Sequence, residues 1–254
     1  MSLIELTNLE VTIGHKTILK SIDLTIEEGT VTAFVGPSGS GKTTLLRTLN
    51  LLQIPTSGRL RVGDTEVIGG KINKRDIRQI RQIRNHSTMV FQQFHLFKNY
   101  TVLQNVVQPL VLSGRFSRKE AEIIAHESLE KVGLAAFENQ YPVTLSGGQQ
   151  QRVAIAFKPK IILFDEPTSA LDPEMVDGVL QVISTLAEEN ISMILVTHEM
   201  AFARKTADNV VFIENGEILT QGPTDLLLSN NNSHERVRAF VHSLYRGSLE
   251  SSAL

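Results

Sequence analysis

The sequence predicts an α/β protein in which helices cover both faces of a largely parallel sheet. Three observations favour this class. Short apolar segments alternate with helical patterns along most of the chain. One of these segments, residues 31–35, is rich in apolar and β-branched residues, as strands buried on both faces are. A glycine-rich loop and then a helical pattern follow it directly.

The length and composition fit a globular protein with one large domain. The chain has 254 residues, of which 41% are hydrophobic and 20% charged. The net charge of -2 gives no global basic field that would attract nucleic acid, so no nucleic-acid partner is expected. The absence of cysteine excludes disulfides and thiol chemistry and fits a reducing cytosol. We find no secretory signal and no apolar run of the ~20 residues that cross a bilayer.

The first third of the chain predicts strands, one helix and a hairpin. Alternation of apolar and polar residues indicates strands, and the run after the glycine-rich loop indicates a helix. A Gly63-Asp64 pair predicts the turn of the hairpin. The expected strands are residues 4–6, 11–13, 21–26 and 31–35, the helix is 43–52, and the hairpin is 59–68.

Residues 71–84 carry six basic residues and one acid. Ile77 and Ile80 lie at helical spacing, so we interpret the segment as a helix with a solvated basic face. A contact with phosphates or lipid head groups is the alternative.

The rest of the chain predicts a helical subdomain followed by a return of strands. The expected helices are residues 101–112, 118–132 and 134–138, and the expected strands are 88–91, 161–165, 192–197 and 209–214. We therefore expect one domain over residues 1–247, with a core of about 1–92 and 160–247. A helical subdomain would occupy about 93–158, and residues 248–254 would form a frayed tail.

The strongest local motif follows the buried strand at residues 31–35. It is Gly36-Pro37-Ser38-Gly39-Ser40-Gly41-Lys42-Thr43, continued by Thr44, and it matches the phosphate-binding pattern G-x-x-x-x-G-K-[ST]. Glycines let the backbone curl so that N–H groups face phosphate oxygens, and the helix amino terminus adds a positive dipole end. Lys42 can reach the outer phosphates, and Thr43 offers a hydroxyl to Mg²⁺. The motif predicts a P-loop NTPase (RecA-like) core that binds ATP and Mg²⁺.

A second motif places two acids at the end of an apolar strand, residues 161–165. Open α/β sheets bind ligands at the carboxyl ends of their strands, which is where Asp165 and Glu166 lie. Asp165 would hold Mg²⁺, and Glu166 would orient or deprotonate the attacking water. Such a pair alone is weak evidence for a site, but its combination with the phosphate loop indicates a catalytic site.

The third motif is Leu145-Ser146-Gly147-Gly148-Gln149, which resembles the signature sequence of ABC ATPases. A serine and two glycines that open a helix can present N–H groups to an anion. In this family two chains dimerise head to tail, and the signature of one covers the nucleotide of the other. The resemblance implies an N-terminal antiparallel β subdomain, a mixed core sheet and an inserted α-helical subdomain that carries the signature.

Three further residues match family motifs in the expected order. Gln92 resembles the glutamine that senses the γ-phosphate, the metal and the water, which makes it both a catalytic and a metal candidate. Asp172 lies in a segment that resembles the D-loop, which contacts the opposite subunit. His198 resembles the switch histidine that bonds the γ-phosphate, although a lone histidine at a strand end is more often structural.

The resemblance is closest to the branch that energises polar amino acid uptake. Residues 91–97, 167–174 and 197–204 carry this likeness. It implies an ATPase on the cytoplasmic face of the inner membrane, bound to integral permease subunits and served indirectly by an extracytoplasmic solute-binding protein. The segment near Gln92 to Phe97 would expose Phe94, Leu96 and Phe97 and receive a short helix of the permease, with ordinary packing between subdomains as the alternative.

Two departures from the family pattern leave alternatives open. Ile13 stands where the family usually stacks an aromatic ring on adenine, so we expect ATP to bind with less base discrimination, unless His15 substitutes. The helix after Arg152 is about four residues, or roughly 6 Å, shorter than in relatives. An importer ATPase therefore competes with a regulatory ABC module of weak hydrolysis. A third alternative is a soluble ABC ATPase that is not coupled to transport, although the usual second cassette or coiled-coil insertion is missing.

Overall fold

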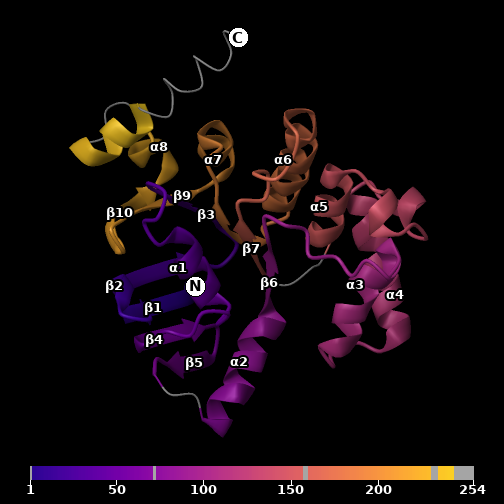
Figure 1. Ribbon diagram of the computed structural model, residues 1–254, viewed down its shortest axis with the longest axis horizontal. Coiled ribbons are helices and arrows are strands. Elements are labelled where there is room, and N and C mark those ends of the chain that lie inside the picture. The colour runs from indigo at the N-terminus through magenta and orange to yellow at the C-terminus, as the bar shows by residue number, and fades with distance from the viewer. Residues whose placement is uncertain (1, 71–72, 157–159, 230–233, 243–254) are drawn as a thin grey trace.

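The computed structural model describes residues 2–70, 73–156, 160–229 and 234–242. Two sheets form the centre of the molecule (Figure 1). One has four strands in the order β2-β1-β4-β5, and the other has six in the order β10-β9-β3-β8-β7-β6.

The four-stranded sheet is antiparallel throughout. It comprises β1 (Ser2–Ile13), β2 (Lys16–Glu27), β4 (Ser57–Val62) and β5 (Thr65–Ile68). The hairpin predicted at Gly63-Asp64 is confirmed. The prediction of two separate strands at residues 4–6 and 11–13 is wrong, because β1 continues through Asn8 with register shifts. Asn8 has φ of 47°, a left-handed conformation that asparagine tolerates better than most residues.

The six-stranded sheet is mixed, as the family resemblance implies. Five strands are parallel: β3 (Val31–Val35), β6 (Ser87–Val90), β7 (Ile161–Asp165), β8 (Ser192–Val196) and β9 (Asn209–Glu214). The sixth, β10 (Glu217–Pro223), is antiparallel to β9. Every residue of β3, β7 and β8 is buried. Because these strands are parallel neighbours, their carboxyl ends meet at one edge of the sheet.

Helices bury both faces of the six-stranded sheet. On one face, α1 (Lys42–Leu49) packs between the two sheets, and Leu45, Leu46 and Leu49 join the core that the sheets share. On the other face lie α6 (Pro173–Glu188) and α7 (Met200–Thr206). The chain also forms α2 (Lys74–His86), α8 (Thr224–Leu227) and a helical segment at 235–242. Along α2, Ile77 is exposed while Ile80 and Ile83 are buried.

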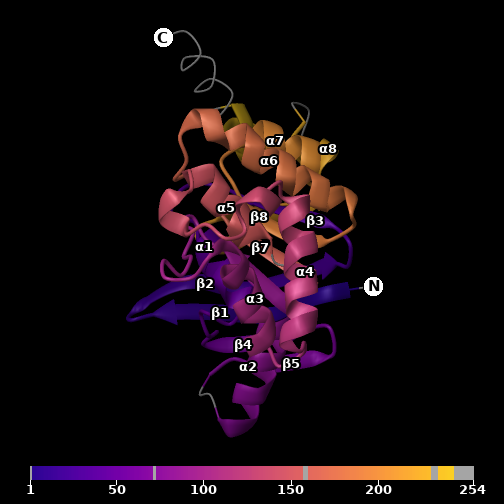
Figure 2. The same ribbon diagram turned by 90° about the vertical axis from the view of Figure 1, so that its right-hand side faces the viewer.

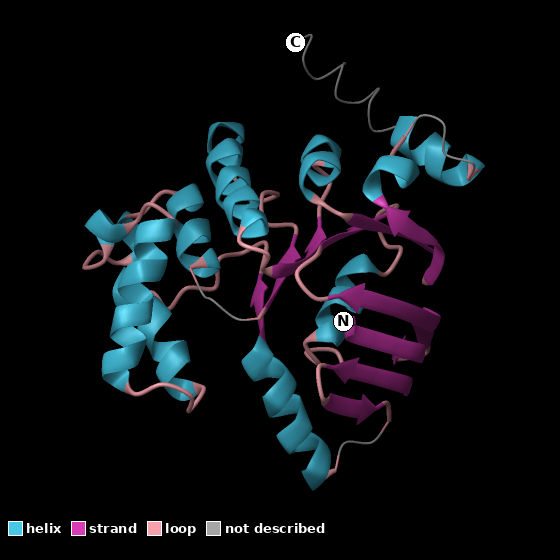
Figure 3. Ribbon diagram, turned by 180° about the vertical axis from the view of Figure 1, so that it is seen from behind, coloured by secondary structure: helices cyan, strands magenta, loops and turns pink. Residues whose placement is uncertain are grey.

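A group of helices stands to one side of both sheets (Figure 3). Its long members, α3 (Val102–Leu112) and α4 (Arg118–Lys131), lie side by side (Figure 2). Two single 3-10 turns, η1 (Ala135–Phe137) and η2 (Pro142–Thr144), lead to α5 (Gly147–Ile155). Residues of these helices form a separate apolar cluster that runs from Val102 to Ala156. The prediction of an α-helix at residues 134–138 is wrong, because this segment forms only the single 3-10 turn η1.

The three helices of this group start where the sequence offers a capping box. The N-cap residues Thr101, Ser117 and Ser146 each accept a bond from the backbone N–H three residues on, and the side chain there bonds back. In α5 this box places the signature at the first turn. The helix ends at Ile155, near the predicted end at about residue 157, which lies outside the described residues.

Candidate nucleotide site

The phosphate loop connects β3 to α1 in a backbone shape that needs glycine. Gly36 has φ of 144°, and a Cβ there would lie 2.0 Å from the carbonyl oxygen of Ile213. Gly41 has φ of 107° and precedes α1 as its N-cap. These angles fold the loop back on the amino end of α1, the arrangement that turns backbone N–H groups toward an anion.

Lys42 is held against the loop itself. Its ammonium group donates to the carbonyl oxygens of Gly36 and Pro37, each at 2.8 Å. Burial lowers the pKa of Lys42, and the charge of Glu166 opposes this shift. The amine is thus placed beside the loop and close to an acid from another strand.

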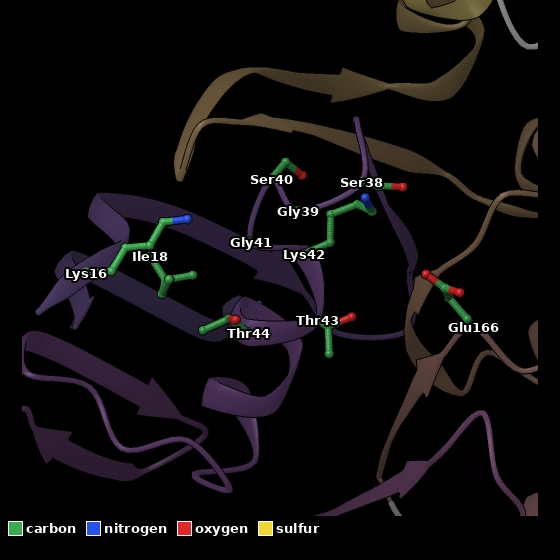
Figure 4. A pocket seen from close by; sticks show the side chains of 10 residues that line it. All are labelled: Lys16, Ile18, Ser38, Gly39, Ser40, Gly41, Lys42, Thr43, Thr44 and Glu166. Atoms are coloured by element: carbon green, nitrogen blue, oxygen red, sulfur yellow. The ribbon is translucent and has the colours of Figure 1, made fainter. Parts of the chain in front are cut away.

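A cavity of about 420 Å³ lies over the loop. Lys16 and Ile18 of β2 form one wall, and Glu166 faces the loop from the opposite side (Figure 4). The floor consists of loop residues that the sequence predicts to bind nucleotide: Ser38, Gly39, Ser40, Gly41, Lys42, Thr43 and Thr44.

The two acids at the end of β7 lie in different surroundings. Asp165 is buried, and its Oδ1 accepts a 2.8 Å bond from the Thr43 hydroxyl. Its Oδ2 accepts a 3.2 Å bond from Arg47. Glu166 has φ of 49°, and its Oε1 lies 3.1 Å from Nε2 of His198, which follows β8. The parallel strands therefore bring the loop, Asp165, Glu166 and His198 together, as the sequence predicts.

The hydroxyl of Thr43 and the carboxylate of Asp165 suit a hard cation. Both present oxygen, the ligand type that Mg²⁺ prefers, and their direct contact shows that both reach one point. The donor set therefore fits the metal that the motif predicts.

The signature lies apart from this cavity in the same chain. Residues Ser146–Gln149 are not among the described residues that line it, and β6 and β7 separate α1 from α5 (Figure 1). A Cβ on Gly147 would lie 3.3 Å from Leu171 and 3.5 Å from Phe94. The N–H of Gly148 points at Sδ of Met175, 3.4 Å away. The signature of the same chain therefore does not line the cavity over the loop.

Three further predicted residues are not among the described residues that line the cavity. Gln92 follows β6 and is exposed, and Asp172 is the exposed N-cap of α6. Ile13, at the end of β1, is 50% exposed. Among described residues, the wall beside the predicted adenine position comes from Lys16 and Ile18 instead.

Sequence reasoning missed Lys16, Ile18 and Arg47. The first two alternate along β2 just past the turn after Ile13, so strand periodicity could have placed both on one face. Arg47 follows Thr43 by four residues on α1, so helical periodicity could have placed it beside Asp165.

The segment after Gln92 is only partly open. Phe97 is 54% exposed, whereas Phe94 and Leu96 are half-buried. The expectation that all three are exposed holds in part for Phe94, because this ring lines an open cavity of about 640 Å³ and also packs against Gly147 of the signature. It also holds in part for Leu96, which lines the same cavity and packs on the helical cluster. Across the described segments, none of the helices has the length and apolar character that spanning a membrane requires.

Comparisons with known proteins agree with this geometry. Residues 19–169 match the family model described as ABC transporter. The chain is 48% identical to the L-cystine transport system ATP-binding protein of Escherichia coli (strain K12), covering 95% of this chain and 98% of that one. It is also 48% identical to the glutamine transport ATP-binding protein of Geobacillus stearothermophilus, covering 90% and 93%.

A solved structure of similar fold is a dimeric ATP-binding cassette in a post-hydrolysis state, bound to ADP and Pi. It has 33% sequence identity and a TM-score of 0.73, over 87% of this chain and 98% of that chain. Sequence family, relatives and fold agree with the loop, the acids and the signature found here. The chain belongs to the ABC transporter family of ATP-binding proteins.

Proposed function

We propose that this chain is the ATP-hydrolysing subunit of an importer that takes up a small polar solute, an amino acid. The observation that carries the proposal is the cavity in which the phosphate loop, Glu166 and the Thr43–Asp165 pair converge. Relatives that match over almost their whole length are named for the transport of cystine and glutamine. This supports an amino acid as the class of solute.

In this proposal the loop residues bind the triphosphate of ATP. The N–H groups between Gly36 and Thr44 face the phosphate oxygens, and Lys42 leaves the carbonyls of Gly36 and Pro37 to reach the outer phosphates. Thr43, Asp165 and Gln92 would hold Mg²⁺. When bound there, the ion would supply positive charge that neutralises the charge developing on the outer phosphates.

Glu166 is the proposed general base. Its carboxylate faces the loop across the cavity and can accept a proton from water placed in line with the γ-phosphate (Figure 4). His198 bonds Glu166 at 3.1 Å and thereby fixes its orientation. After it releases Glu166, a protonated Nε2 of His198 would be free to donate to the γ-phosphate.

The second half of each site comes from a second copy of the chain. Ser146, Gly147, Gly148 and Gln149 would cover the nucleotide held by the partner's loop, and Asp172 would contact the partner. The separation of α5 from α1 within one chain supports this arrangement (Figure 1). Two ATP molecules are then held in one homodimer.

A permease in the cell membrane is the proposed membrane partner. Exposed Phe97 lines a groove of about 430 Å³ between the end of α2 and α3, where Leu112 is 76% exposed. A short apolar helix of the permease fits such a groove. The chain would then act on the cytoplasmic face of the inner membrane. A solute-binding protein would work on the other side of that membrane, and no nucleic-acid partner is proposed.

Phosphate release in the presence of the permease subunits tests the proposal. We expect Glu166→Gln to slow release by about 100-fold or more while ATP binding remains. Glu127→Gln, an exposed acid on α4, is the matched control and should keep the natural rate. An equal rate in the two variants would contradict the role of Glu166.

The same assay tests the short helix α5. Its last residues, Val153 and Ile155, are buried, and β7 keeps its pairing with β6 and β8. We therefore expect a version with one more helical turn after Ala156 to hydrolyse ATP at a rate similar to the natural chain. Hydrolysis only in the lengthened version would favour a regulatory module instead. Hydrolysis that does not respond to the permease would favour an uncoupled ATPase.

A further inference from the structure

Both oxygens of the Asp165 carboxylate are held by side chains of α1. Thr43 donates to Oδ1 at 2.8 Å, and Nη2 of Arg47 lies 3.2 Å from Oδ2. Thr43 and Arg47 are four residues apart and therefore project from one face of the helix. The Asp165 side chain is only 7% exposed, so its charge requires a partner.

Arg47, rather than Lys42, is that partner among the described residues. The ammonium group of Lys42 donates to two loop carbonyls instead. The Arg47 side chain is 48% exposed and can move into water without burying its charge. Asp165 lies at the end of a buried strand and cannot move in the same way. The ion pair therefore joins a fixed anion to a cation that is able to leave.

We propose that Arg47 is a positioning residue that occupies the carboxylate of Asp165 until nucleotide and divalent cation arrive. This inference rests on the proposed role of Asp165 at the metal. Arg47 neutralises and orients the buried carboxylate in the free chain, and it must release Oδ2 before that oxygen can face a cation. Because Arg47 is itself positive, it opposes binding of a second positive charge at this place. The chain would thus bind a divalent cation well only together with the nucleotide.

Removing the charge of Arg47 should therefore strengthen binding of a divalent cation. The probe is Mn²⁺, whose free concentration is followed by electron paramagnetic resonance in titrations of the full chain saturated with ADP. For Arg47→Gln and Arg47→Met we expect the dissociation constant of Mn²⁺ to fall by roughly threefold to fivefold, because a half-exposed ion pair competes only weakly. Arg47→Lys keeps the charge and should remain at the natural value.

Arg59→Gln is the matched control, because Arg59 pairs with Glu66 on the four-stranded sheet and its loss changes the net charge equally. A merely structural Arg47 would lower the melting temperature of Arg47→Gln and Arg47→Met but leave their Mn²⁺ affinity equal to that of Arg59→Gln. That result would overturn the inference, as would weaker Mn²⁺ binding in both variants. If ADP fails to promote Mn²⁺ binding even in the natural chain, the proposed metal role of Asp165 fails, and the inference fails with it. The Mn²⁺ titration of the natural chain thus tests the proposed function, and its comparison with the variants tests the role of Arg47.

Discussion

Gly36 and Gly39 of the phosphate loop both adopt left-handed backbone but have different surroundings. A Cβ at Gly36 would meet the Ile213 carbonyl oxygen at 2.0 Å. A Cβ at Gly39 would have no heavy atom of the described chain within 4 Å beyond Gly39 and its two chain neighbours. The phosphate-binding pattern requires glycine at position 36 and leaves position 39 open to any residue. The packing of β9 against the loop gives the physical reason, because the Ile213 carbonyl leaves no space for a Cβ at position 36.

This difference predicts unequal losses of stability on substitution by alanine. Gly39→Ala should lower the free energy of unfolding by about 1–2 kcal/mol, the cost of left-handed backbone for an L-residue. Gly36→Ala adds a clash with backbone and should cost about 3 kcal/mol or more. Urea unfolding of both variants without nucleotide measures the difference. Equal losses would show that the Ile213 carbonyl moves away freely.

The pairing of β1 with β4 contains an ion pair whose contribution to stability depends on pH. Glu5 and Arg61 lie opposite each other in this pair and form an ion pair, with Nε of Arg61 3.1 Å from Oε2 of Glu5. The bonds from Arg61 and Ser2 lower the pKa of Glu5 to about 2. The unfolded chain therefore takes up a proton on Glu5 at higher pH than the folded chain does.

The resulting stabilisation is complete above the ordinary pKa of glutamate and is lost as the pH falls toward 2. We expect the natural chain to lose more unfolding free energy between about pH 6 and about pH 3 than Glu5→Gln, which has no such carboxyl. Urea titrations at both pH values measure this. Glu10→Gln, on the same strand, is the control and should behave like the natural chain. The same loss in Glu5→Gln and in the natural chain would show that the ion pair does not contribute.

At the scale of the whole molecule, local patterns predicted much of the fold. The bounds of β3, β7 and β9 match the prediction, since continuous apolar runs identify buried strands. The joining of two predicted strands into β1 was missed, because it depends on a left-handed Asn8 that no alternation pattern signals. Which sheet each strand enters depends on contacts between distant residues, and here the family resemblance supplied the division.

The site could be predicted where one motif contains all the residues and less well where tertiary packing selects them. The loop and the two acids follow from their motifs. The partial burial of Phe94 was missed, because its ring packs on Gly147, which lies 53 positions further along the chain. Lys16 contacts the site from β2, which carries no nucleotide motif, and Arg47 contacts Asp165 from α1 at a position beyond the end of the motif.

The central claim is that one nucleotide lies between the phosphate loop of one chain and the signature of a second chain. Because the natural sequence has no cysteine, single introduced thiols react without background. The most direct measurement mixes a chain carrying Ser38→Cys with a differently tagged chain carrying Ser146→Cys, both with Glu166→Gln to retain ATP, and adds a short thiol crosslinker. The account predicts mixed crosslinked dimers that require ATP, and few dimers when only one of the two cysteine variants is present. An ATP-independent crosslink, or no mixed crosslink with ATP bound, would contradict it.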